Sequence, residues 1–352
     1  MHQIAMCCHF KRVNAVATAK FLLEHFYYGQ LVVDQKPQDG MRLLAASRGV
    51  SPKLAAQAVE RVMLPPLIRS ENGSWALVRG RSRHFPFLLT QSYQGQHGQV
   101  IHHYVLASPD MLKAVGGNLS ALRQLVQKEM PVYEKDGNLL KPLSFDPGDE
   151  QTVDDQIDDI LELMTVTKNR VPLIESMLAA IVQGRQLIVQ GAPTVLDEHI
   201  QFIAGLLALL PSSARFGVTF TTHSLPSTDI DVQIRFYSDD APPKETVVFN
   251  WATKTVQGDD FDDEYSRYVI SQLRLDAELV IQRNTAMASI AGWRLNEGDK
   301  LADALGYASK RLRLDDALRN NQPVNKDEVA RVLSDDETLP GDLRVLYARH
   351  LV

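Results

Sequence analysis

The sequence has few cysteines, no long apolar run and no excess of positive charge. Its 352 residues include only two cysteines, Cys7 and Cys8. Neighbouring cysteines make a poor disulfide pair and lack the spacing of a zinc site, so we expect free thiols in a reducing compartment. No stretch approaches the roughly 18 apolar residues of a membrane-spanning helix. The N-terminus also lacks the apolar core and cleavage site of a secretory signal, which together indicate a cytoplasmic protein with no membrane partner.

The charge balance argues against a nucleic-acid partner. The net charge is -6, whereas nucleic-acid binders usually carry a basic domain or stripe. Hydrophobic content of 45% and charged content of 23% are ordinary for a globular protein. The length allows two domains with ample core.

The stretch 184–224 is the clearest structural signal in the chain. Residues 185–190 form an apolar run with β-branched members, and residues 216–222 alternate in the manner of a strand. Between them, Thr194 is placed to cap a helix that Pro211 ends. The pattern predicts a strand–helix–strand unit.

The helix of this unit has one apolar stripe. Asp197 and Glu198 fall in its first turn, where the helix dipole favours acids. Leu206, Leu207 and Leu210 follow at helical spacing, so we expect all three to face a core.

The flanking segments alternate between strand and helix patterns. Gly29 interrupts the first strand and indicates a bulge or a close backbone approach. Ser-Pro pairs at 51–52 and 108–109 each predict the start of a helix. The expected strands are 26–34, 41–47, 75–79, 85–93, 100–107, 232–237 and 246–251, and the expected helices are 51–63, 108 onward, 119–129, 157–164, 172–182, 265–275, 278–293, 300–313 and 326–333.

These elements predict a mixed α+β and α/β fold with two domains. The first is an antiparallel sheet with inserted helices, and the second is a strand–helix–strand core followed by a helical tail. Residues 141–156 hold prolines, a glycine and acids, as an exposed linker does. The expected division is an N-terminal extension outside the fold at 1–20, an α+β domain at 21–140, the linker at 141–156, an α/β domain at 157–264 and a helical tail at 265–352.

The histidines His102 and His103, with His97 nearby, are the first candidates for chemistry. Adjacent strand residues point to opposite faces, so the pair cannot easily bind one metal, and a structural role is favoured. Thr221, Thr222 and His223 combine hydroxyls with an imidazole but lack the nucleophile-elbow pattern and an identifiable acid partner.

Two other patterns indicate no cofactor. The turn at 190–193 lies before a helix N-terminus but lacks the glycines and the lysine of a nucleotide-binding loop. The acidic run at 259–264 lacks the pattern of a calcium-binding EF-hand loop. Arg79, Arg81 and Arg83 form a basic hairpin end, which can be a partner site or simply a solvated turn.

Several short phrases of the sequence carry a family resemblance. They are YYGQ at 27–30, LLAASRGVS at 43–51, SWALVRG at 74–80, HGQVIHHYVL at 97–106 and LLALLPSSARFGVTFTTHS at 206–224. Together they resemble the bacterial GTPase-associated protein family in its N-terminal and middle domains. The similarity covers about residues 26–251, and Gln99 stands where that family commonly has Arg. The resemblance implies an adaptor or regulator that works beside small GTPases in bacterial signalling or conflict systems.

Two functions remain open at this point. The first is a non-enzymatic interaction module that docks a GTPase or another protein through Arg79, Arg81, Arg83, His102, His103, Thr221, Thr222 and His223. The second is a hydrolase or nucleotide-binding enzyme that uses the His97, His102 and His103 region or the Thr221, Thr222 and His223 region. Convergence of either group in one pocket would favour the enzyme.

Overall fold

The computed structural model describes residues 20–64, 73–82, 85–148, 151–225, 230–237, 246–258 and 262–352. The extension expected at 1–20 therefore lies, apart from Lys20, outside the described residues. Within them the fold is the mixed helix and strand class that the sequence predicts.

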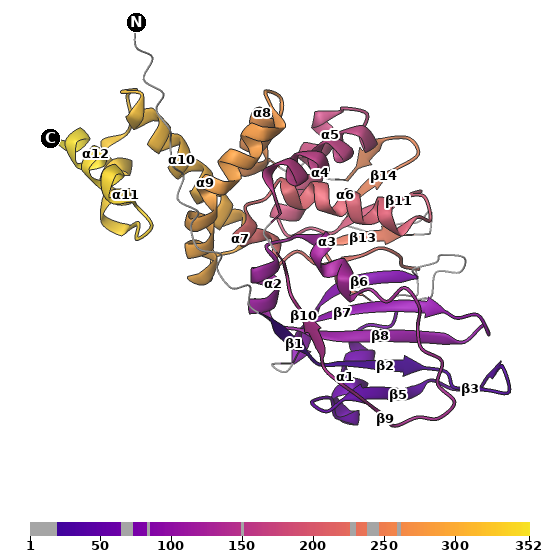
Figure 1. Ribbon diagram of the computed structural model, residues 1–352. Coiled ribbons are helices and arrows are strands. Elements are labelled where there is room, and N and C mark those ends of the chain that lie inside the picture. Colours follow the sequence, from indigo (N-terminus) through magenta and orange to yellow (C-terminus); the bar gives the residue numbers. More distant parts are fainter. Residues whose placement is uncertain are drawn as a thin grey trace, which may run out of the picture.

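A single sheet of 11 strands runs through the described chain (Figure 1). Two small pairs lie outside it, β1 (Phe21–Leu23) with β10 (Leu143–Phe145) and β3 (Val32–Val33) with β4 (Lys36–Pro37). Across the large sheet the order is β15 (Thr255–Gln257), β14 (Val247–Asn250), β11 (Leu187–Gln190), β13 (Ile234–Tyr237), β12 (Phe220–Thr221), β6 (Ser74–Ser82), β7 (Phe85–Gln94), β8 (Val100–Ala107), β2 (His25–Gly29), β5 (Arg42–Ser47) and β9 (Asn138–Leu140).

The first half of the sheet is antiparallel from β6 to β5, as predicted. Gly29 makes the predicted close approach, because a Cβ atom there would lie 2.5 Å from the carbonyl oxygen of Val100. Two predicted caps are also present: Ser51 accepts from the amide of Leu54, and Ser108 from that of Met111. They begin α1 (Pro52–Arg61) and α2 (Pro109–Val115).

The helix predicted at 119–129 is shorter than expected. It consists of α3 (Leu119–Leu122) and one 3-10 turn, η1 (Arg123–Leu125). The buried side-chain amide of Gln91 accepts from the backbone amide of Gln127 at 2.8 Å and donates to its carbonyl at 2.7 Å. These bonds take the backbone groups of Gln127 out of any continuing helix.

The second half of the sheet is parallel from β14 to β12 and carries the predicted strand–helix–strand unit. Leu206, Leu207 and Leu210 are buried in the main core, which confirms the predicted apolar stripe. The expected Thr194 cap is wrong: the N-cap is Val195, with no side-chain cap bond. The helices here are α4 (Val153–Val166), α5 (Val171–Val182), α6 (Leu196–Ala208) and α7 (Ser212–Arg215).

The two halves are joined through their strands. β6 pairs antiparallel with β12, and the Thr222 hydroxyl accepts from the Trp75 amide at 2.8 Å. The stretch 141–156 is also not a bare linker, because it contains β10 and the first turn of α4. Phe145 of β10 is buried in the main core. The exposed linker predicted there is therefore wrong in part, since an apolar side chain anchors it.

The helical tail leaves the sheet and ends in a small cluster of its own (Figure 1). Its first helices pack on the main core, whereas the end of α10 packs with α11 and α12. No helix among the described residues is long and apolar enough to cross a membrane. The tail consists of α8 (Glu264–Leu273), α9 (Ala277–Asn296), α10 (Leu301–Arg319), α11 (Lys326–Asp335) and α12 (Gly341–Leu351), the last of which the sequence did not predict.

Candidate functional site

A pocket of about 460 Å³ is lined by residues of α2, α7 and α9 and of the start of α4. Figure 1 labels these four helices. Its walls are the last turn of α2, the short helix α7 and one face of α9. The volume falls within the roughly 300–1,000 Å³ that is typical of small-molecule sites. Separate parts of the chain therefore form one pocket that is large enough for a small molecule.

Arg215, the last residue of α7, is the buried cation of this pocket, with 5% of its surface exposed. Its Nε atom donates to the Leu210 carbonyl at 2.7 Å, and Nη2 donates to the side-chain oxygen of Gln156 at 2.7 Å. Among the described residues, Nη1 has no hydrogen-bond partner and no carboxylate forms an ion pair with Arg215. Burial lowers the pKa of the guanidinium to about 10, and Tyr265 and Asp159 offset only part of that effect.

Two glycines allow the end of α2 to lie against this arginine. Gly116 caps α2 in the left-handed conformation, with φ of 60°. Gly117 follows with φ of +85°, and a Cβ atom there would lie 2.6 Å from the Cβ of Arg215. Any larger residue at 117 would therefore push the wall away from the guanidinium.

The rest of the described lining mixes polar and apolar side chains and holds no carboxylate. Lys113 is exposed at the pocket, with its Nζ atom 5.3 Å from the centre of the Phe216 ring. Asn284 is buried; its amide donates to the Ala208 carbonyl at 3.0 Å. The described lining includes no Asp, Glu, His or Cys. The pocket is thus equipped to bind a negative group, but it lacks the side chains that usually serve as general bases or metal ligands.

The histidines singled out from the sequence lie elsewhere, in the first half of the sheet. His102 and His103 are 2% and 1% exposed, and their ring contacts differ as expected for neighbours on a strand. His103 lies 3.0 Å, Nε2 to Nδ1, from His25 and stacks on Tyr27. Burial lowers the pKa of His102 to about 4 and that of His103 to about 3, where the charge of His25 adds to the effect. Both are neutral interior side chains at ordinary pH.

The His25 ring fixes the hydrogen positions of this pair. Its Nε2 atom lies 2.9 Å from the carbonyl oxygen of Lys141, which can only accept, so Nε2 carries the proton. Its Nδ1 atom is then the acceptor, and His103 donates to it from Nε2. Through these bonds the pair ties the start of the segment before β10 to the sheet.

The candidates Thr221, Thr222 and His223 lie at the end of β12 and just after it, where the two halves of the sheet join. The Thr222 hydroxyl contacts both the amide and the carbonyl of Trp75, and the Thr221 hydroxyl donates to the His223 carbonyl at 2.8 Å. Both threonines are buried. These hydroxyls hold strands and a turn together, and β6 and β7 separate them from the histidines of β8.

The basic hairpin is described only in part. The side chains of Arg81 and Arg83 lie outside the described residues. Arg79 is exposed, donates from Nη2 to the Gly217 carbonyl at 3.2 Å and lies over the Phe87 ring. His97 lies in the turn between β7 and β8, away from the pocket. Of the eight predicted partner residues, the six whose side chains the structure describes are spread over the sheet and the segment just after β12.

Sequence reasoning missed Arg215 and its pocket. Arg215 lies in the run LPSSARFG after α6, within a phrase that points to family resemblance and not to chemistry. The one local signal is a charged residue between Ala214 and Phe216, and that pattern also fits an exposed turn. Among the described residues, no three His, Cys, Asp or Glu side chains gather as a metal site would require.

Comparison with models of known protein families and with curated proteins gave no significant match.

Proposed function

We propose that the chain is a non-enzymatic interaction module that acts as an adaptor or regulator beside a bacterial small GTPase. The observation that carries the proposal is the placement of the side chains that could do chemistry. His103 on β8 and Thr222 just after β12 are both bound to neighbouring groups of the fold, and neither lines the pocket beside Arg215. The enzyme alternative needs one of the two groups of candidates to converge in a pocket, and this placement gives it no support.

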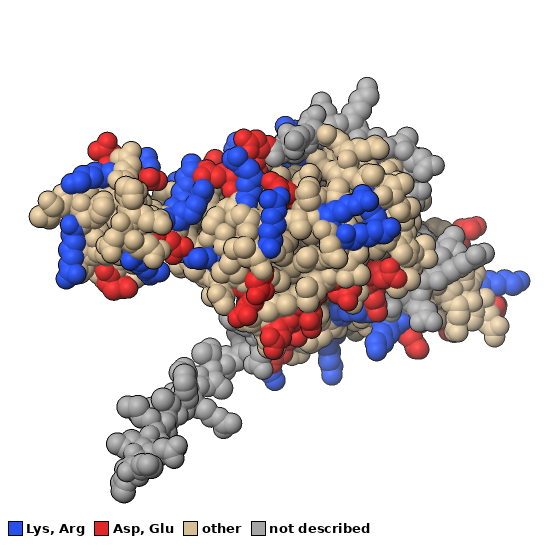
Figure 2. Space-filling view, turned by 90° about the horizontal axis from the view of Figure 1, so that it is seen from above, with Lys and Arg blue, Asp and Glu red and all other residues tan. Residues whose placement is uncertain are grey.

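The partner class rests on the phrases shared with the GTPase-associated family. Those phrases fall on β2, β5, β6, β8 and the segment from α6 to β12. Figure 2 shows Lys and Arg interspersed with Asp and Glu on the described part of one face, without a large basic area. Such a mixed surface suits a protein partner better than nucleic acid.

The exposed end of β6 is the proposed contact surface, because Arg79 is exposed there and Arg81 follows it in the chain. The test is affinity capture from the native host with the full chain as bait, in buffers with GTP or GDP. We expect capture of a GTP-binding protein, reduced about tenfold by the double change Arg79→Glu, Arg81→Glu, since rim charges act on association.

The matched control is Arg48→Glu, which reverses an exposed arginine after β5. It should capture as much partner as the unaltered chain. Absence of any GTP-binding protein above an empty-bait control would contradict the proposal. Equal capture by all three baits would place the contact elsewhere on the molecule.

A further inference from the structure

We infer that the pocket between α2, α7 and α9 is a binding site for a small organic oxyanion, a phosphate or a carboxylate. This site is independent of the proposed GTPase contact. The starting observation is Arg215, a nearly buried guanidinium that lines the pocket without a carboxylate at ion-pair distance in the described chain. Buried charges in proteins are normally paired, because removal of an ion from water is costly.

The nearest acid does not compensate this charge directly. Asp159 influences Arg215, but its carboxylate accepts from the side-chain amide of Gln151 at 2.5 Å. No ion pair between Asp159 and Arg215 occurs. Two of the guanidinium nitrogens donate hydrogen bonds to Leu210 and Gln156, so Nη1 is the nitrogen that can donate to a ligand. An oxyanion at Nη1 would supply the missing counter-charge.

A second cation stands at the same pocket. The ammonium of Lys113 lies over the Phe216 ring and lines the hollow from the α2 side. The two charged side chains of the described lining, Arg215 and Lys113, are both cations. Lysine acts as a point charge for phosphate or carboxylate, so both side chains are suited to bind an anionic group.

The remaining wall favours an organic ligand over a bare ion. Phe216, Leu295 and Ala288 give the hollow an apolar side, beside the charged groups of Arg215 and Lys113. Small-molecule sites commonly combine apolar walls with a few fixed polar groups. A volume of about 460 Å³ exceeds what an inorganic anion would fill.

The test is isothermal titration of the full chain with phenyl phosphate and, separately, benzoate, at one low ionic strength. Each probe carries an aromatic body and one oxyanion, so the two arms distinguish phosphate from carboxylate. We expect saturable binding of at least one probe, with a rise in melting temperature that follows probe concentration.

Two variants link the binding to this pocket without touching Arg215, which the fold also uses. Lys113→Met should weaken binding about tenfold, the scale of one lost charge-assisted contact. Ala288→Phe should abolish it by filling the hollow. The matched controls are Lys53→Met on α1 and Ala286→Phe on the exposed side of α9, and both should bind as the unaltered chain does.

Thermal unfolding of each variant without probe establishes that the fold is intact. Failure of both probes to bind the unaltered chain at millimolar concentration would overturn the inference. Binding that persists unchanged in a folded Ala288→Phe variant would overturn it as well, because the probe would then sit elsewhere. A GTP-binding partner could still be captured in either case.

Discussion

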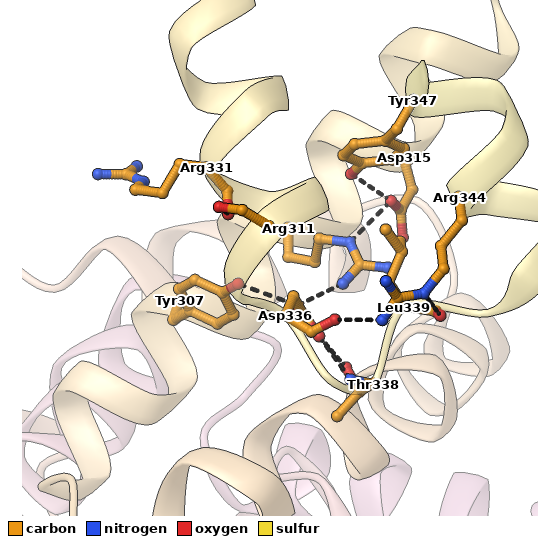
Figure 3. A network of polar contacts seen from close by, with 10 residues as sticks. Tyr307, Arg311, Asp315, Arg331, Asp336, Thr338, Leu339, Arg344 and Tyr347 are labelled. Carbon is orange, nitrogen blue, oxygen red and sulfur yellow. Dashed lines mark hydrogen bonds and ion pairs between the residues drawn. The ribbon is translucent and has the colours of Figure 1, made fainter. Parts of the chain in front are cut away.

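Replacement of Arg311 by Met should release the end of the helical tail while leaving the sheet folded. The Arg311 side chain is 1% exposed and forms ion pairs with Asp315 and Asp336 (Figure 3). The Tyr307 hydroxyl donates to Asp336 at 2.9 Å, and the Tyr347 hydroxyl donates to Asp315 at 2.6 Å. One arginine thus joins α10 to the residues after α11 and, through Tyr347, to α12.

The magnitude follows from the burial of the partners. Removal of Arg311 leaves two buried carboxylates without their counter-charge, and breaking a buried pair from one side costs about 3–5 kcal/mol. The local core of α11 and α12 is separate from the main core. We therefore expect the loss to appear as local opening of the terminal helices, not as global unfolding.

Hydrogen exchange measured by mass spectrometry tests this expectation directly. Protection of amides in 326–351 should fall roughly 10²- to 10⁴-fold in Arg311→Met, the factor that corresponds to this cost, while protection of β7 stays unchanged. The matched control is Arg331→Met, which makes the same substitution at an exposed position of α11. Unchanged protection of 326–351 in the Arg311 variant would refute the reasoning, as would an equal loss in the control.

Three further outcomes are expected. Leu207→Ala should cost about 2–5 kcal/mol in chemical denaturation because Leu207 is buried in the main core, whereas Leu161→Ala, at a half-exposed position on α4, should cost far less. The free energy of unfolding should fall as pH drops from 6.5 toward 4, by roughly 1.4 kcal/mol per pH unit for each buried histidine. The reason is that His102 and His103 bind protons in the unfolded chain over this range but stay neutral in the folded chain. His102→Leu should flatten that slope in urea titrations at stepped pH, and an identical slope would contradict the assignment. Titration with GTP, GDP, ATP and zinc should give no micromolar binding, and micromolar binding lost on a change at Gly191 or His102 would favour the enzyme hypothesis.

The sequence predicted those features of the fold that depend on neighbouring residues alone, such as helix caps and glycine positions. The caps at Ser51 and Ser108 were readable because a hydroxyl before a proline serves the first turn wherever it occurs. The role of Gly29 was predictable because a glycine within a strand often marks a bulge or a close backbone approach, and here it allows a close approach to Val100. The same reasoning failed for the strand expected at 216–222, which shrinks to β12 at Phe220–Thr221. There the side chain of Arg215 bonds back to Leu210 and holds the preceding residues in α7.

Contacts between distant segments were beyond the reach of a single sequence. The pairing of β6 with β12 continues in a hydrogen bond between Trp75 and Thr222, which are 147 positions apart. Nothing in the sequence of either strand identifies the other as its partner. This pairing joins into one sheet the two parts of the chain that the sequence composition had divided into separate domains. The pocket likewise needs α2, α7 and α9, which come from distant parts of the chain, so no single run of residues could predict it.

Two of the buried arginines, Arg311 and Arg215, show how the surroundings distinguish a structural charge from a binding charge. Arg311 and Arg215 are both nearly inaccessible, at 2% and 5% exposure. Around Arg311, two carboxylates and two tyrosines complete the hydrogen bonding, and its pKa is raised above the ordinary value because these partners outweigh burial. Around Arg215, carbonyl and amide oxygens take two nitrogens, its pKa is lowered by burial, and a hollow adjoins it. A ligand at Arg311 would have to displace its partners, whereas an anion at Arg215 would complete what the fold leaves uncompensated.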